Sequence, residues 1–141
     1  MNKTTLLKPL ILITLLLTSC GESPDKWSPD KVLNRRDQRE TRSWVKIDDK
    51  EVQDQDYEIA QAINIAAPYK HVKKNKTAST NCFEYSLDVS GYIFPLNCTM
   101  TFYDDGYVEV KSSKAKYIYS FDETKALVLY ASAVSFVALN Q

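Results

Sequence analysis

The chain has 141 residues, enough for one domain once its N-terminal segment is set aside. Hydrophobic residues make up 44% and charged residues 26%, which is ordinary for a globular protein. Lys3 and Lys8 are two of the 18 basic residues and precede Cys20, so 16 basic and 18 acidic side chains follow, a charge of about −2. This balance excludes the strongly basic surface of a nucleic-acid-binding protein. Three cysteines and one histidine provide little material for a metal site, so we expect no metal and no cofactor.

Residues 1–19 have the organisation of a secretory signal. Lys3 and Lys8 form a cationic start, and an apolar run follows from Pro9 to Leu17. The run is shorter than the roughly 20 apolar residues that a membrane-spanning helix needs. It closes on Leu17-Thr18-Ser19-Cys20, which resembles the lipobox of bacterial lipoproteins.

The resemblance implies that Cys20 is the lipidated first residue of the mature protein. In that family a diacylglyceryl group is attached to the cysteine sulfur, cleavage falls just before it, and the new amine is acylated, typically with palmitate. Several acyl chains suffice for stable anchoring, so the membrane is the first expected partner. Gly21 follows in place of Asp, which in enteric-type sorting favours the outer membrane, facing the periplasm. The alternative is an ordinary signal peptide cut nearby, with Cys20 an incidental thiol.

Residues 20–50 are predicted to form a lipid-anchored linker with a short helix. The small, polar residues 21–26 are typical of a flexible stalk. Ser28-Pro29-Asp30 is typical of a helix start, and the helix is expected to run to Arg42. Its arginines would form a basic face for head groups or an acidic partner, or would only solvate a marginal helix. Residues 44–47 predict a short strand.

Residues 51–141 are predicted to form a small α+β domain. Residues 56–67 fit a strand or a helix, and their alanines and the following Pro68 favour the helix. The polar residues 70–79 are expected to be a loop. An antiparallel β-meander with one cross-strand disulfide is expected from 82 to 139, because β-branched and aromatic residues dominate there. Its strands are predicted at 82–88, 92–103, 107–111, 115–121 and 126–138.

Two glycine-containing turns predict hairpins in this meander. Val89-Ser90-Gly91 and Asp104-Asp105-Gly106 each fit a three-residue loop. The first would place Cys82 opposite Cys98, and in an exported protein such thiols pair as a disulfide. A redox-active pair and two free thiols are the alternatives, although the spacing is unlike Cys-x-x-Cys.

Aromatic residues crowd the predicted sheet. In one interpretation, one sheet face is core and the 56–67 helix covers the other. In the other interpretation, an exposed tyrosine-rich face binds another protein, with lysines near one end that would otherwise only solvate an edge or turn. The candidate interaction surface comprises Tyr107, Lys111, Lys116, Tyr117 and Tyr119.

These features predict a non-catalytic protein. The single histidine, His71, lies in a predicted loop with no identifiable catalytic partner, and the sequence has no glycine-rich phosphate loop. A deep pocket lined by Asp88, Glu109 or His71 would instead indicate an enzyme. We expect a small lipoprotein that acts as an interaction or envelope-assembly module on an envelope protein, as secretion pilotins or exclusion proteins do. The alternative is an immunity protein or an inhibitor of a lytic enzyme, because small disulfide-stapled β domains on lipid anchors resemble lysozyme inhibitors.

Overall fold

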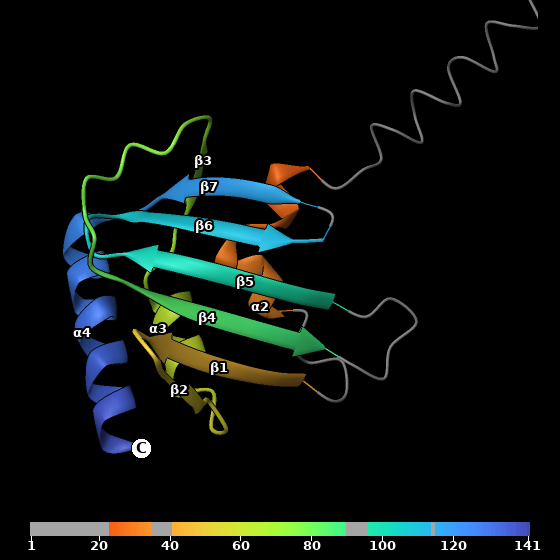
Figure 1. The fold of residues 1–141 in the computed structure, drawn as a ribbon. Coiled ribbons are helices and arrows are strands. Elements are labelled where there is room, and N and C mark those ends of the chain that lie inside the picture. The colour runs from red at the N-terminus through yellow and green to blue at the C-terminus, as the bar shows by residue number, and fades with distance from the viewer. Residues whose placement is uncertain (1–22, 35–40, 90–95, 114) are drawn as a thin grey trace, which may run out of the picture.

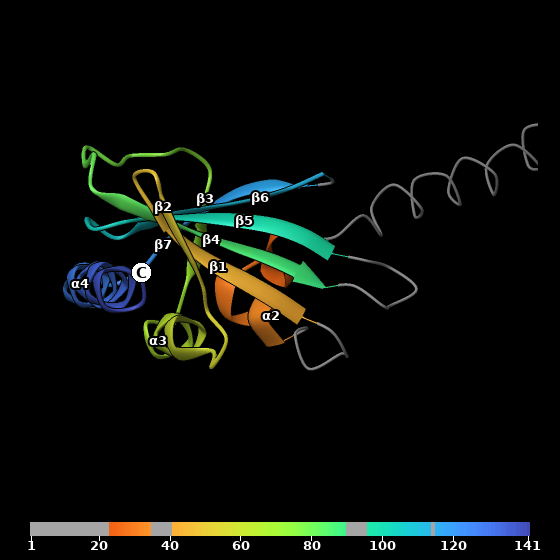
Figure 2. The ribbon, with the colours of Figure 1, turned by 60° about the horizontal axis from the view of Figure 1, so that its bottom comes forward.

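The computed structural model describes residues 23–34, 41–89, 96–113 and 115–141, which form two layers (Figures 1 and 2). Among these residues, one layer is a seven-stranded antiparallel sheet in the order β2-β1-β4-β5-β6-β7-β3. The helices all lie on one face of this sheet, as Figure 2 shows, and we call the other face the open face. The predicted α+β class is confirmed. The elements are η1 (Pro24–Lys26), α2 (Pro29–Asn34), β1 (Thr41–Ile47), β2 (Lys50–Gln53), α3 (Glu58–Ile65), β3 (Lys70–Val72), β4 (Cys82–Val89), β5 (Leu96–Tyr103), β6 (Tyr107–Ser112), β7 (Lys116–Ser120) and α4 (Glu123–Leu139).

Strict alternation along the strands separates a core face from the open face. One row of cross-strand neighbours runs over five strands and points to the helices, and four of its five side chains are fully buried. The next row along the strands points to the open face. The core row is Val45, Tyr85, Met100, Val110 and Tyr117, and the open row is Trp44, Ser86, Thr99, Lys111 and Lys116.

The predicted disulfide between Cys82 and Cys98 is wrong. Cys82 lies opposite Tyr103, whereas Cys98 lies opposite Leu87, five residues further along β4, which is about 17 Å at 3.4 Å per residue. The alternation also turns the two side chains to opposite faces, with Cys98 buried on the core face. A disulfide needs Cα atoms within about 7 Å, so neither the register nor the facing allows one.

Burial, and not the expected turn, sets the register of β4 and β5. The pairing places three apolar residues of β4 opposite three of β5 on the core face, and a shift by an odd number of residues would turn one set to solvent. Val89, the first residue of the predicted three-residue loop, lies in β4 and pairs with Leu96, whereas Ser90 and Gly91 lie outside the described residues. The three core pairs are Phe83–Phe102, Tyr85–Met100 and Leu87–Cys98.

The N-terminal part of the described chain belongs to the core, contrary to the predicted stalk. η1 occupies Pro24–Lys26, and Trp27 directly after it is only 1% exposed. The helix start at Pro29 is confirmed, and Asn34 is the last described residue of α2. Arg42, where the helix was expected to end, lies in β1. The intervening arginines, Arg35, Arg36 and Arg39, lie outside the described residues.

The sheet is larger and placed differently than predicted. The strand expected at residues 44–47 is confirmed as part of β1, and the sheet therefore starts at Thr41. Lys70–Val72, expected in a loop, pairs with β7 as the edge strand β3. The last strand is β7, because residues 126–138 form most of helix α4 and no strand.

The predicted helix at 56–67 is confirmed as α3, and Asp54 satisfies its first backbone donors. The carboxylate, buried with 1% exposed, accepts hydrogen bonds from the backbone N–H groups of Glu58 (2.8 Å), Ile59 (3.1 Å) and Ala60 (3.0 Å). The Tyr85 hydroxyl donates to the same carboxylate at 2.8 Å. This buried polar group therefore links α3 to the middle of the sheet.

The second predicted turn is confirmed, and its aspartates hold a loop. Gly106 has a φ of +100°, and a Cβ there would lie 2.7 Å from the Phe121 carbonyl oxygen. The Thr77 hydroxyl donates to Asp105 at 2.6 Å, and the Asn81 amide donates to Asp104 at 3.1 Å. Both carboxylates thus fasten the segment between β3 and β4 to the β5–β6 turn.

Candidate interaction surfaces

The predicted surface of tyrosines and lysines is divided between the two faces of the sheet. Lys111 and Lys116 lie opposite each other and are exposed on the open face, and Tyr107 shares that face. Tyr117 and Tyr119 point to the helical layer, because their cross-strand partners in β6 are buried valines. The five side chains therefore do not form one surface.

Tyr119 is a core residue, with 1% of its surface exposed. Its hydroxyl donates a hydrogen bond to the carbonyl of Pro24. Its ring meets the ring of His71 edge-on, with 5.7 Å between the ring centres, and Tyr117 contacts the same imidazole at 5.5 Å. Burial raises the pKa of the Tyr119 hydroxyl well above its ordinary value. These aromatic rings join β3, β7 and the N-terminal segment, so they are structural.

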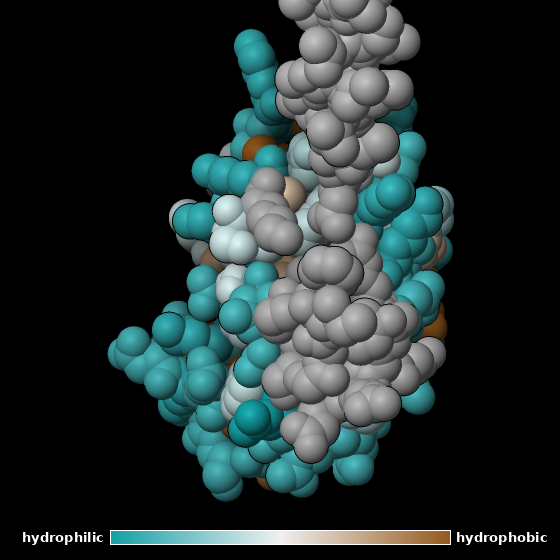
Figure 3. Space-filling view, turned by 90° about the vertical axis from the view of Figure 1, so that its right-hand side faces the viewer, coloured by the Kyte–Doolittle hydropathy of each residue, from teal (hydrophilic) through white to brown (hydrophobic). Residues whose placement is uncertain are grey.

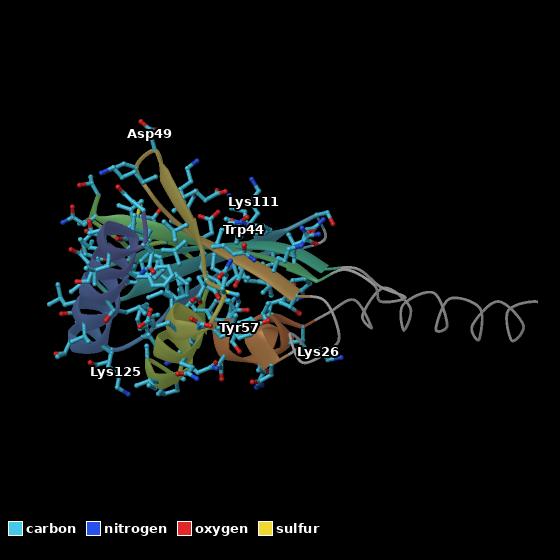
Figure 4. The ribbon with its side chains drawn as sticks, turned by 90° about the horizontal axis from the view of Figure 1, so that it is seen from below. Lys26, Trp44, Asp49, Tyr57, Lys111 and Lys125 are labelled. Atoms are coloured by element: carbon cyan, nitrogen blue, oxygen red, sulfur yellow. The ribbon has the colours of Figure 1, made fainter. Side chains whose placement is uncertain are left out.

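The open face carries a shallow trough of about 710 Å³. Trp44 and Lys111 lie on the side of the sheet away from the helices, as Figure 4 shows. Between them the trough is lined by Ser and Thr hydroxyl groups and by carboxylates. Lys116 forms a long ion pair of 3.8 Å with Glu109. The face is polar and mixed in charge, which is typical of the solvated side of an antiparallel sheet.

The three side chains that would indicate an enzyme are not brought together. Asp88 and Glu109 line the trough on the open face, whereas His71 packs against Tyr117 and Tyr119 on the core face. The trough is open to solvent and is not a deep pocket. The arrangement therefore offers no common site for Asp88, Glu109 and His71.

Cys82 has the environment of an unreactive thiol. Burial raises its pKa, and the carboxylates of Glu84, Asp48 and Asp104 raise the pKa further. A raised pKa leaves less thiolate at neutral pH, which does not favour a nucleophilic role for Cys82. Without a bond from Cys82 to Cys98, the resemblance to disulfide-stapled lysozyme inhibitors also loses the feature that it rested on.

The most unusual surface belongs to the helical layer. Four large apolar side chains of α4 are exposed: Leu127 by 57%, Val128 by 62%, Val134 by 40% and Leu139 by 82%. Ile65 at the end of α3 is exposed by 76%. We call this set the outer helix surface. Scattered exposed apolar residues are ordinary, but this set gathers on two neighbouring helices.

Helix α4 is uncharged around its circumference beyond its first turn, where Glu123 and Lys125 are exposed. Its inner face packs on the sheet and on α3, and its outer face after Lys125 carries no charge, whereas a surface helix normally turns charged residues outward. No charged side chain occurs from residue 126 to residue 141. The buried side chains of the inner face are Ala126, Leu129, Ala133, Phe136 and Val137.

An apolar groove of about 280 Å³ separates α3 from α4 and adjoins the outer helix surface. Ala62 and Ala66 of α3 and Val128 of α4 are among its lining residues. At its end the Lys125 ammonium donates a 3.0 Å hydrogen bond to the Ala67 carbonyl, which ties the two helices together. The single copy therefore presents ridges and a groove of apolar character.

The outer helix surface has no counterpart among the predicted sites, because residues 126–138 were expected to form a strand. Two local signals indicate the helix. Asp122 accepts a hydrogen bond from the Lys125 backbone N–H at 2.9 Å, which is the arrangement of an N-cap. Ala126, Leu129 and Ala133 also follow the three- and four-residue spacing of a buried helix face.

Within the described ranges, no group of three or more His, Cys, Asp or Glu side chains could hold a metal ion. None of the helices in those ranges has the length and apolar character needed to cross a bilayer. Comparison with protein-family models, curated proteins and solved structures finds no match to this chain.

Proposed function

We propose that this protein is a membrane-anchored bacterial lipoprotein that acts, without catalysis, as an interaction module in the cell envelope. The observation that carries the proposal is the outer helix surface, where Leu127, Val128 and Ile65 are each more than half exposed. Aqueous exposure of such side chains is unfavourable, and their burial against a partner would recover that free energy. The outer helix surface is thus the proposed docking face.

The lipid would be carried by Cys20, and the fold would lie close to the bilayer. Ser23 is the first residue that the structure describes and the third residue after Cys20. An extended chain therefore allows at most about 11 Å between the Cα atoms of Cys20 and Ser23. Figures 1 and 2 place η1 toward one end of the strands and α4 at the other. Figure 3 shows the end of the molecule that lies opposite α4. The visible described surface of that end is mainly hydrophilic, which suits contact with lipid head groups. The docking face would therefore point away from the anchor, within reach of other envelope proteins.

The anchor is tested with Cys20→Ala in a bacterium that processes lipoproteins. We expect an unprocessed precursor that takes up no labelled fatty acid, because the sulfur that accepts the diacylglyceryl group is gone. The processed, labelled protein with Cys20 intact is the control. Lipid label on the Cys20→Ala protein would show that Cys20 is not the modified residue.

The docking face is tested by placing a photo-crosslinking amino acid at position 128 of the membrane-anchored protein. We expect discrete protein adducts on illumination. The matched control carries the same amino acid at position 111, because Lys111 is exposed on the open face, on the side of the sheet away from the helices. Absence of position-128 adducts, or equal adducts from both positions, would contradict an interaction through the outer helix surface.

A further inference from the structure

We infer that the trough on the open face of the sheet binds an uncharged glycan strand, with one sugar ring stacked on Trp44. The inference goes beyond the proposed function, because it concerns the open face and makes no use of the outer helix surface. Three observations support it: a large aromatic ring outside the core, a hollow floor of small side chains beside that ring, and a lining of hydrogen-bonding groups.

The first observation is that Trp44 is not part of the core. Its side chain is half-buried on the open face and lies outside the core cluster that contains Tyr85 and Tyr119. Ser86, its cross-strand neighbour on β4, is too small to cover the indole, and both residues line the trough. The face of an indole ring is electron-rich, so it attracts the weakly positive C–H groups on one side of a sugar ring.

The second observation is the relief of the row that starts at Trp44. The row continues through Ser86 and Thr99 to Lys111, so two small hydroxyl side chains lie between two large ones. At about 4.8 Å per strand, the Cα atoms of Trp44 and Lys111 are about 14 Å apart. This length exceeds that of a single sugar ring. Because the trough is open to solvent, a polymer can lie across it without threading an end into a pocket.

The third observation is the chemistry of the lining. Beside the hydroxyl groups of the floor, the carboxylates of Glu84 and Glu109 lie one row along the strands, on either side of Thr101. Carboxylates and hydroxyls accept hydrogen bonds from sugar hydroxyl groups, and the Lys111 ammonium donates them. A sugar ring carries hydroxyl groups at its rim and C–H groups on its face, so it can use this lining and the indole together.

The charge of the lining favours a ligand without charge. Its ionisable residues are Glu84, Asp88, Glu109 and Lys111, three acidic and one basic, which gives a charge of about −2. Lys116 lies 3.8 Å from Glu109 and offsets part of this charge. An anionic polymer would be repelled by the carboxylates, and a cationic ligand that spans the trough would meet Lys111. An uncharged glycan avoids both costs.

The test is calorimetric titration of the full, processed protein in micelles of a detergent without sugar head groups. The probes are chito-oligosaccharides and cello-oligosaccharides, which are uncharged, and polygalacturonate oligomers, which are anionic. We expect at least one uncharged probe to bind and the anionic probe to give no heat. Trp44→Ala should weaken binding by about tenfold, an effect that one stacked aromatic ring can account for. The matched control is Tyr107→Ala, which removes a ring from the same face outside the trough lining and should leave binding unchanged.

A second variant tests the site with Trp44 in place. Ser86→Arg puts a long side chain on the floor of the trough and should also weaken binding by about tenfold, while thermal melting shows that the variant is folded. Tryptophan fluorescence locates the ligand, because Trp27 is only 1% exposed and Trp44 is the more accessible ring. A bound oligosaccharide should therefore protect the emission of Trp44 from quenching by acrylamide.

The outcomes separate the glycan site from the proposed function. The glycan site is overturned if neither uncharged probe binds at up to about 10 mM, if the anionic probe binds equally well, or if Trp44→Ala binds like the parent. Protein adducts from the photo-crosslinker at position 111 would also overturn it, because a protein would then occupy the trough. If an uncharged probe binds through Trp44 but position 128 gives no protein adducts, the glycan site stands and the docking face fails.

Discussion

The molecule has two outward surfaces, the open face of the sheet and the outer helix surface, and they differ in kind. Across the open face, hydroxyl groups alternate with charged residues, and Trp44 is the one large ring in the trough there. The outer face of α4 is without charge over most of its length. A polar sheet face is stable in water as it stands, whereas an apolar helix face is typical of an interface. The contrast favours the helical layer as the side on which the proposed partner would dock.

The largest expected effect separates the two faces of α4. Leu129→Ala should lower the free energy of unfolding by about 2–5 kcal/mol, since the side chain is only 2% exposed and its removal leaves a cavity. Leu127→Ala, two residues away, should change it by less than about 0.5 kcal/mol in a single copy. Urea unfolding of both variants measures the difference. Equal losses of unfolding free energy in the two variants would mean that the fold buries Leu127 as well as Leu129.

A smaller effect is expected between the two faces of the sheet. Tyr85→Phe removes the hydroxyl that donates to the buried Asp54 carboxylate at 2.8 Å, which should cost about 1–3 kcal/mol. Tyr107→Phe removes a hydroxyl on the open face and should cost less than about 0.5 kcal/mol. Thermal or urea unfolding of the pair checks this. A larger loss for Tyr107→Phe would reverse the assignment of the faces.

The smallest effect is expected for charges on the open face. Lys116→Ala removes an ion pair with Glu109 that spans 3.8 Å and whose lysine side chain is 64% exposed, so the loss should be below about 0.5 kcal/mol. Unfolding measured at low and at high salt should show this small difference shrink further, because salt screens exposed charges. A loss above about 1 kcal/mol that persists in salt would show that Lys116 has a structural role beyond this exposed ion pair.

Much of the local structure could be predicted because its signals are local. The β4, β6 and β7 strands follow from short runs of β-branched and aromatic residues. Helix α3 follows from its alanines and the proline after it, and the β5–β6 turn follows from Gly106, whose positive φ an L-residue adopts only with strain. The lipobox resemblance at Cys20 is likewise local and remains a prediction.

The candidate site could not be predicted in the same way, because its features depend on which segments pack together. The sequence by itself determined an α+β chain with a β-rich second half and an uncharged C-terminal stretch. The Asp122 cap is a local signal for a helix in this stretch, but its apolar residues fit either period, and the tertiary structure decided for the helix because the sheet buries one of its sides. The register of β4 and β5 was likewise set by burial of their core faces, which separated Cys82 from Cys98. Burial is a property of the assembled layers, and for that reason the face left uncovered became visible only in the fold.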